Sequence, residues 1–234
     1  MAYAANSAWT PDQPLSGPTG IGLVAEAQTG TVAPFRALER RVVSLGVAGT
    51  WKVSESAVFR ASYPVQAAWG SDGARVLGSG DIRIGTSVRL FDRGVEGWID
   101  SMVKLPNAPD EQGLGTDETD WTGQCWVRWN GPLRIEGGVG LAILGSPNAF
   151  AAQDDALVAD LRVLLPLGPL EARAEAGGRV WSADNPSDIR ARVGGTWTGQ
   201  GLTAGAEVAA GLTPAAPDVS ARVWVGLVPG ANRP

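Results

Sequence analysis

Apolar and polar residues alternate with a period of two along most of this 234-residue chain, and no segment shows a helical repeat. In residues 81–90, for example, Ile82 and Ile84 share one face, while Arg83 and Arg89 share the other. A period of two is that of a β-strand with one apolar and one polar face. The chain is therefore predicted to be all-β.

The alternating segments predict twelve strands, at residues 20–30, 40–52, 56–69, 80–91, 95–105, 119–130, 133–144, 156–167, 169–181, 188–198, 201–212 and 218–228. The connections between them alternate in length. The longer ones lie at residues 31–39, 70–79, 106–118, 145–155, 182–187 and 213–217, and the intervening turns are very short. Long loops and short turns then lie at opposite ends of an up-and-down meander.

An even number of strands of about ten residues, with short turns at one end and long loops at the other, is typical of bacterial outer-membrane barrels. A closed sheet of twelve strands has an interior too wide for small side chains such as Gly and Ala to fill. The charged face is then expected to line the lumen and the apolar face to meet lipid. The predicted fold is a single up-and-down antiparallel transmembrane β-barrel over residues 18–229. Apolar runs are only a few residues long, so no transmembrane helix is predicted.

Five tryptophans on the predicted lipid-facing parity lie within a residue or two of a strand end: Trp51, Trp69, Trp121, Trp129 and Trp197. Aromatic side chains gather at both headgroup boundaries of a membrane. Trp69 and Trp121 belong to the long-loop end and the other three to the short-turn end, so both aromatic girdles are represented. The single cysteine, Cys125, also falls on this face and is expected to behave as a small apolar group.

The opposite parity places nineteen charged residues in the predicted lumen. They are Arg60, Arg83, Arg89, Glu96, Asp100, Lys104, Arg128, Arg134, Glu136, Asp160, Arg162, Glu171, Arg173, Glu175, Arg179, Arg190, Arg192, Glu207 and Arg222. Twelve are basic and seven acidic, so a water-filled lumen would favour anions modestly. In the alternative interpretation, the same residues form ion pairs between strands that fill and stiffen a closed barrel. The inward Trp98, Trp126, Trp181 and Trp224 either fill space or line a path for aromatic solutes.

The composition excludes several kinds of chemistry. The chain has no His and one Cys, which removes Ser-His-Asp and Cys-His catalysis, His-ligated zinc and four-cysteine metal sites. An enzyme is therefore disfavoured, and no cofactor or metal is expected. A net charge of −5 without a basic run argues against binding of nucleic acid. The first residues lack the pattern of a signal peptide, so we expect the mature chain of a bacterial outer-membrane protein.

Three stretches between residues 80 and 121 resemble a known family. They read Gly80-Asp81-Ile82-Arg83-Ile84-Gly85, then Val103-Lys104-Leu105-Pro106, then Gly113-Leu114-Gly115-Thr116-Asp117-Glu118-Thr119-Asp120-Trp121. They resemble two strand starts and a strand end of the MetA-pathway phenol-degradation family of outer-membrane barrels. Asn107 and Ala108 stand where that family commonly has Thr and Gly. The resemblance implies a transporter-like barrel without catalytic residues.

The connection at residues 106–118 is the longest and most acidic, with Asp110, Glu111, Asp117 and Glu118. The spacing of these carboxylates does not match an EF-hand, so a solvated loop is expected rather than a calcium site. This loop is also a candidate gate that folds into the lumen, and a candidate contact for an envelope protein partner.

Three functions remain. The first is a passive pore for small polar or amphipathic solutes, and the second is a plugged structural barrel that anchors or presents loops in an envelope complex. A membrane-embedded enzyme is a weak third, because Asp, Glu, Ser, Lys and Arg alone would have to supply its chemistry. Membrane lipid and small solutes or ions in the lumen are the expected partners. Residues 1–17 are expected to form a flexible periplasmic extension rather than a plug, and residues 230–234 a C-terminal tail.

The parity assignment also makes a prediction about stability. An Arg at the outward Val163 is expected to destabilise the barrel by about 2–4 kcal/mol, and an Arg at the inward Gly140 is expected to be much milder.

Overall fold

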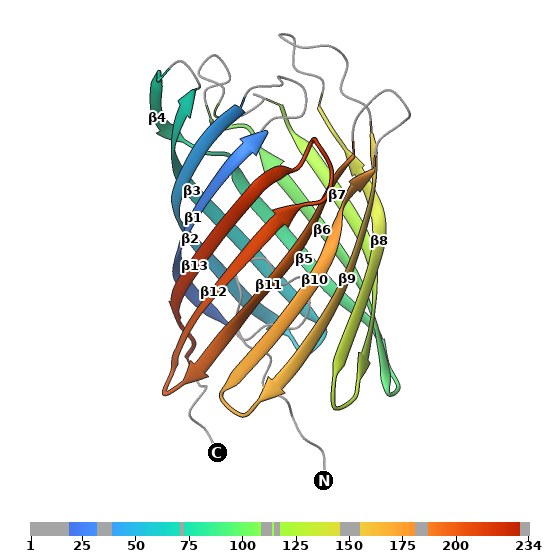
Figure 1. Ribbon diagram of the computed structural model, residues 1–234. Coiled ribbons are helices and arrows are strands. Elements are labelled where there is room, and N and C mark those ends of the chain that lie inside the picture. Colours follow the sequence, from blue (N-terminus) through green and yellow to red (C-terminus); the bar gives the residue numbers. More distant parts are fainter. Residues whose placement is uncertain are drawn as a thin grey trace.

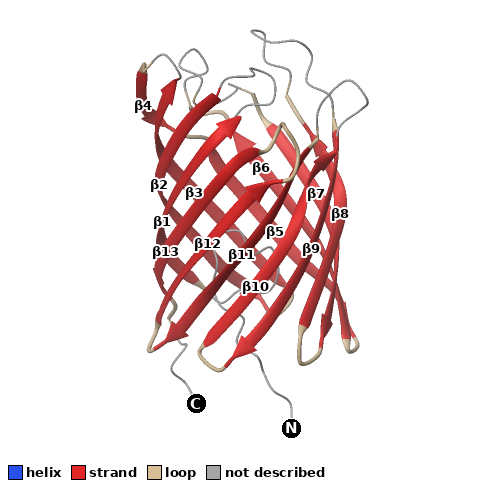
Figure 2. Ribbon diagram, viewed as in Figure 1, coloured by secondary structure: helices blue, strands red, loops and turns tan. Residues whose placement is uncertain are grey.

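The computed structural model of the protein describes residues 19–31, 39–70, 73–108, 114, 118–145, 155–180 and 187–229. All regular elements of these residues are β-strands (Figure 2). No helix in this part of the chain is long and apolar enough to span a membrane. The prediction of an all-β chain is confirmed.

The strands, in chain order, are β1 (Gly20–Thr31), β2 (Glu39–Ser54), β3 (Ala57–Gly70), β4 (Arg75–Ser79), β5 (Ile82–Asp92), β6 (Val95–Leu105), β7 (Asp120–Asn130), β8 (Arg134–Ile143), β9 (Ala156–Leu167), β10 (Leu170–Val180), β11 (Asp188–Gly199), β12 (Leu202–Gly211) and β13 (Pro217–Leu227). Apart from β4, each corresponds to one predicted strand, with ends shifted by no more than a few residues. The alternation of apolar and polar positions was therefore a sufficient signal for the strands.

The strands close into one antiparallel barrel. Neighbours in sequence pair from β5 through β13, β13 pairs with β1, and β1 pairs with β2. The pairings of β2 with β3 and of β3 with β5 complete the ring. Figure 1 shows the strands inclined to the barrel axis, as closure of a sheet requires. The strand ends that lead into the longer connections lie at one end, and the tight turns lie at the other. Closure leaves no open sheet edge within the barrel wall.

The short strand β4 corrects the prediction of a loop over residues 70–79. Both β4 and β5 pair with β3, but Ser79 faces Val65 while Arg83 faces Ser62, so the register slips by one residue between them. The break falls at Gly80, whose N–H donates to the carbonyl of Pro64 at 2.8 Å. A Cβ at Gly80 would lie 2.7 Å from the Pro64 ring, so glycine relieves crowding at this bend of the strand. Thus β4 continues β5, and the barrel wall has twelve strands.

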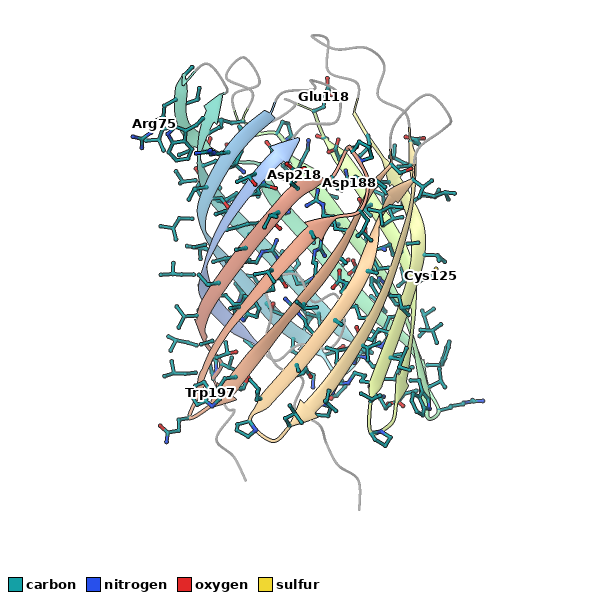
Figure 3. All side chains as sticks on the ribbon, in the orientation of Figure 1. Arg75, Glu118, Cys125, Asp188, Trp197 and Asp218 are labelled. Carbon is teal, nitrogen blue, oxygen red and sulfur yellow. The ribbon has the colours of Figure 1, made fainter. Side chains whose placement is uncertain are left out.

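The two faces of the wall differ in character. Among the described residues, thirty-eight large apolar side chains are exposed, almost all on the outer parity, including Leu45 at 58% and Val139 at 66%. Figure 3 shows them projecting around the barrel. An apolar band of this extent is far larger than the patches that proteins expose to water, and it suits the hydrocarbon of a membrane. The buried polar side chains lie on the inner face.

Candidate functional site

The candidate functional site is the inner face of the barrel. All nineteen charged residues predicted for the lumen occupy the inner parity of their strands, and eighteen of them are buried or half-buried. Arg83, near the long-loop end, is the exposed one. Because inward side chains on neighbouring strands stand opposite one another, the register decides which charges meet.

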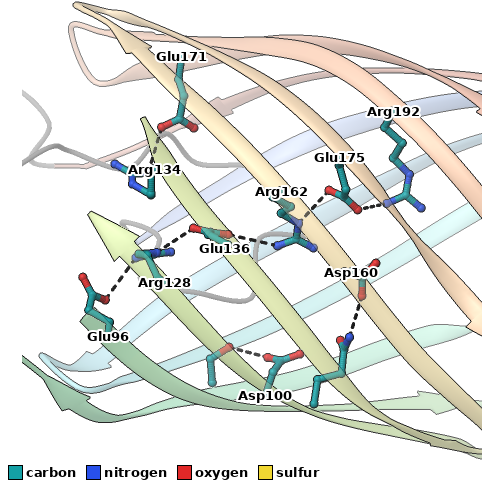
Figure 4. Close-up of polar contacts among 12 residues, drawn as sticks. Glu96, Asp100, Arg128, Arg134, Glu136, Asp160, Arg162, Glu171, Glu175 and Arg192 are labelled. Carbon is teal, nitrogen blue, oxygen red and sulfur yellow. Dashed lines mark hydrogen bonds and ion pairs between the residues drawn. The ribbon is translucent and has the colours of Figure 1, made fainter. Parts of the chain in front are cut away.

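One ladder of alternating charge crosses six consecutive strands, from β6 to β11 (Figure 4). Its members, each the cross-strand neighbour of the next, are Glu96, Arg128, Glu136, Arg162, Glu175 and Arg192. Arg128 Nε donates to Glu136 Oε1 at 2.8 Å, and Arg162 Nε and Arg192 Nη1 donate to the two oxygens of Glu175 at 2.8 and 2.5 Å. Longer ion pairs join Arg128 to Glu96 at 3.5 Å and Arg162 to Glu136 at 3.7 Å. The ladder thus ties six strands together from the inside.

A second ladder begins on β10, two residues closer to the short turn than Glu175, and runs to β1. Arg173 pairs with Glu207 across Gly194, whose missing side chain lets the two groups meet over the intervening strand. Glu207 and Glu26 then stand on either side of Arg222, at 3.4 and 2.9 Å from its guanidinium nitrogens. A separate pair, Arg134 with Glu171, joins β8 to β10 at 3.1 Å.

Other inward charges form local pairs. Arg60 pairs with Asp100, which also accepts a hydrogen bond from Ser87 at 2.6 Å. Asp160 accepts a hydrogen bond of 2.7 Å from Gln124. Arg89 pairs with Asp92 at 3.1 Å near a short turn.

At the long-loop end, Lys104 lies 2.8 Å from Asp120 and 3.6 Å from Asp81. Arg190 donates to both oxygens of Asp188, at 2.8 and 2.6 Å. Arg83 and Arg179 differ from the other ten basic residues of the set, because neither makes an ion pair within the described part of the chain.

Three buried tryptophans pack against the arginines of the ladders. Trp98 and Trp126 are cross-strand neighbours, each 1% exposed, and Trp224 is 3% exposed. The Arg162 guanidinium lies 4.4 Å from the centre of the Trp126 ring, and that of Arg173 lies 5.1 Å from the Trp224 ring. Stacking of this kind holds an arginine in place while leaving its edge free to bind carboxylates. The predicted inward Trp181 lies outside the described residues.

A small cavity separates two triads of charge, Arg162–Glu175–Arg192 and Arg173–Glu207–Arg222. Its volume is about 20 Å³, and these six residues and Leu164 line it. This is enough room for about one water molecule. Here the space beside the wall is therefore narrow and highly charged.

Within the described residues, four acidic side chains outside the predicted set form ion pairs on the inner face. They are Glu26, Asp81, Asp120 and Asp188, each of which pairs with a basic residue of the predicted set. Glu26 could have been found by the same alternation along β1, and the three aspartates by their positions at strand starts. With them the set holds eleven acidic against twelve basic residues. The predicted excess of basic charge is therefore almost cancelled.

The five tryptophans predicted to form girdles lie at the barrel ends. Trp51, Trp121, Trp129 and Trp197 are exposed on the outer face, between 38% and 47%. Trp69 is half-buried, with the guanidinium of Arg75 over its ring at 5.5 Å. Their role at the membrane boundary stays a prediction.

Part of the loop at residues 106–118 folds over the inner wall. Ala108 and Leu114 are buried and pack against Val42 and Ala68 of β2 and β3. Asp81 anchors the start of the loop by accepting hydrogen bonds from the N–H groups of Asn107 and Ala108, at 3.2 and 3.1 Å. Of the acidic residues considered for calcium, Asp110, Glu111 and Asp117 lie outside the described residues.

Comparison with known proteins shows which solved structures share this fold. No family model matches the chain, and no curated protein matches it. Among solved structures, the KdgM porin covers 89% of this chain and 98% of its own, with a TM-score of 0.54 and 10% identity. The KdgM porin in complex with disordered oligogalacturonate gives a TM-score of 0.56. The translocator domain of the autotransporter NalP from Neisseria meningitidis covers 93% of this chain and 90% of its own, with a TM-score of 0.56 and 18% identity. The chain therefore has the fold of outer-membrane porins and translocator barrels, while its resemblance to the MetA-pathway family stays a prediction.

Proposed function

We propose that this protein is a β-barrel of the bacterial outer membrane that lets small polar or amphipathic solutes and ions pass through its lumen. The observation that carries the proposal is the division between the faces, with apolar side chains outside and charged side chains inside one closed wall. Such a wall is stable in lipid and leaves a polar interior. Its likeness in fold to a porin, one form of which is in complex with an oligogalacturonate, supports a role with solutes.

The ladders suggest that the path through the lumen is narrow. Over most of its length it would show little preference between anions and cations. Charges in a pore select ions only when they are not neutralised by neighbours. Here the acidic and basic residues stand opposite one another, and Glu136 at 0% exposure is enclosed by Arg128 and Arg162. We therefore expect small conductance steps, with a weak preference for anions from the remaining basic groups.

The burial of paired charges in the lumen also favours a second function, that of a structural barrel. Glu96, Arg128, Arg134 and Glu171 are all less than 10% exposed and engaged in ion pairs. A lumen filled this way would hold the barrel rigid and pass nothing. The protein would then anchor or present its long loops, with residues 106–118 as the contact for an envelope partner.

Single-channel recording of the refolded full chain in a planar bilayer, under a salt gradient, distinguishes the two. The expected result is discrete current steps, with a reversal potential that shows a slight preference for anions over cations. Silence from protein shown to be inserted, by its resistance to added protease, would overturn the channel and favour the structural barrel.

A further inference from the structure

At the level of the first ladder, the inner face is charged over six strands and neutral over the next five. The cross-strand row that begins at Glu96 on β6 reaches Arg192 on β11 with a charged residue at every step. The same row continues on β12, β13, β1, β2 and β3 with Ala209, Ser220, Gln28, Val42 and Ala68. In Figure 1, β13, β1 and β2 lie on the left of the barrel and β8 and β9 on the right. The charged and neutral parts of the row therefore face one another across the lumen.

Six uncharged residues of β13, β1, β2 and β3 form the middle of the neutral part, and we call them the neutral wall. Each is half-buried, whereas four of the six residues of the first ladder are fully buried. The neutral wall therefore stays open to water where the ladder is closed. It stops short of Ser62, whose cross-strand neighbour is Arg83. Its members are Gln28, Ser44, Gly46, Pro64, Gln66 and Ser220.

Among the side chains that the structure describes, charge reaches the inner face of these four strands at few places. Glu26 and Arg222 stand side by side and pair with each other at 2.9 Å. Arg60 is buried and pairs with an aspartate of β6. Lys52 and Asp218 lie near strand ends, at opposite ends of the barrel. A solute beside the neutral wall thus meets no unpaired charge from these strands.

The polar side chains of the neutral wall are not engaged with one another. Within the described part of the chain, Gln28, Ser44, Gln66 and Ser220 form no hydrogen bond through their side chains. A serine hydroxyl and a glutamine amide each both donate and accept hydrogen bonds, so they match the hydroxyl and amide groups of a solute. A charged solute would find no opposite charge on this wall to compensate for the water that it loses.

We propose that uncharged solutes rich in hydroxyl or amide groups pass through the lumen along the neutral wall and bind its glutamine and serine side chains on the way. The proposal rests on the proposed channel function and deepens it, because it names the class of solute and the side of the lumen that the solute follows. The first ladder, on the other side, then keeps its part of the lumen closed.

The accessibility of the neutral wall can be tested with cysteine variants of the full chain, refolded into vesicles. A charged methanethiosulfonate reagent that does not cross lipid is expected to modify Ser44→Cys and Ser220→Cys, each in a Cys125→Ser background. The matched control is Ser87→Cys, an inner-face serine of β5 that is 0% exposed and donates to Asp100 at 2.6 Å. The control is expected to react about tenfold more slowly, because thiol reactivity depends on exposure. Equal rates at the three positions, or no reaction at Ser44→Cys and Ser220→Cys, would overturn the proposal.

Swelling of the same vesicles measures which solutes pass. The probes are ribitol, which is neutral, and sodium glutamate, whose anion also has five carbon atoms. Wild-type barrels are expected to pass ribitol several times faster than glutamate. Modification of Ser44→Cys, which adds bulk and charge to the wall, is expected to slow ribitol about tenfold. The same treatment of Ser87→Cys is expected to leave the rate unchanged.

The outcomes distinguish the wall from the channel. If glutamate passes as fast as ribitol, or if ribitol passes the modified Ser44→Cys barrel at the unmodified rate, the proposal is wrong and the channel stands. Passage of neither probe through inserted wild-type barrels would overturn the channel and the solute path together.

Discussion

At the scale of single residues, the exposed tryptophans are supported by glycines. Each lies over a glycine two residues away on the same face, in the pairs Trp51 with Gly49, Trp121 with Gly123, Trp129 with Gly131, and Trp197 with Gly199. A Cβ on any of these glycines would overlap the indole ring. An aromatic ring that covers a glycine shields its backbone and compensates for its poor strand propensity.

We predict that Gly123→Ala displaces the Trp121 ring and breaks its hydrogen bond to Ser101 Oγ, which is 2.9 Å long. Overpacking of this kind costs about 1–3 kcal/mol. A shift in tryptophan fluorescence and a lower urea midpoint are the expected readings. The control is Gly137→Ala, an outer-face glycine at which an added Cβ would meet no atom within 4 Å. Equal midpoints for the two variants would contradict the role of the pair.

We predict that loss of a charge at the centre of the first ladder lowers the stability of the barrel strongly. Glu136→Gln would leave Arg128 and Arg162 without their shared carboxylate in a site that is 0% exposed at Glu136. Removal of one partner from a buried ion pair typically costs about 3–5 kcal/mol. A urea titration of the refolded barrel measures the loss.

The matched change is Glu55→Gln at a short turn. A hydrogen bond from Lys52 holds the pKa of Glu55 below its usual range, but this ion pair is open to water. Exposed pairs add little to stability, so no measurable change is expected there. A loss at Glu136 no greater than that at Glu55 would mean that the ladder does not stabilise the barrel.

At the scale of the strand, the two faces should tolerate charge differently. Val163→Arg places a cation on the outer face of β9, where the expected cost is about 2–4 kcal/mol in lipid. The sequence-based comparison with Gly140→Arg is wrong, because a Cβ at Gly140 would collide with the carbonyl oxygen of Gly123 on β7. Ser220→Arg is the better inward change, since Ser220 faces only Ala209 and Gln28. Refolding into vesicles with equal stability for both variants would contradict the assignment of faces.

The strands were predictable because a period of two survives in each of them, whereas the break at Gly80 was not. Its cause is non-local, since Pro64 on β3 accepts the Gly80 N–H and leaves no room for a Cβ. The same limit applies to the lumen. Parity assigned Arg173 and Glu207 to the inner face, but their pairing across Gly194 depends on the register of three strands. Register is a property of the closed sheet, so the charges were predictable and their partners were not.

At the scale of the whole molecule, the balance of charge in the lumen follows from closure. Strand β13 brings Arg222 against Glu26 of β1, a separation of 196 residues along the chain. Without this pairing, Arg173 and Arg222 would share the carboxylate of Glu207 within the described residues. Closure of the barrel thus brings opposite charges together in the middle of the lumen.

The orientation of the whole wall can be tested through the chain's single cysteine. Cys125 is exposed on the outer face of β7 between Ile99 and Val139, which are 44% and 66% exposed. We predict that a fluorophore on Cys125, in barrels refolded into vesicles, is quenched strongly by brominated lipid and weakly by aqueous iodide. A fluorophore on Ser220→Cys in a Cys125→Ser background should show no quenching by lipid, because Ser220 faces the lumen. Stronger quenching of the Cys125 label by iodide than by lipid would mean that the apolar face does not meet the membrane, and the transmembrane orientation of the barrel would then be wrong.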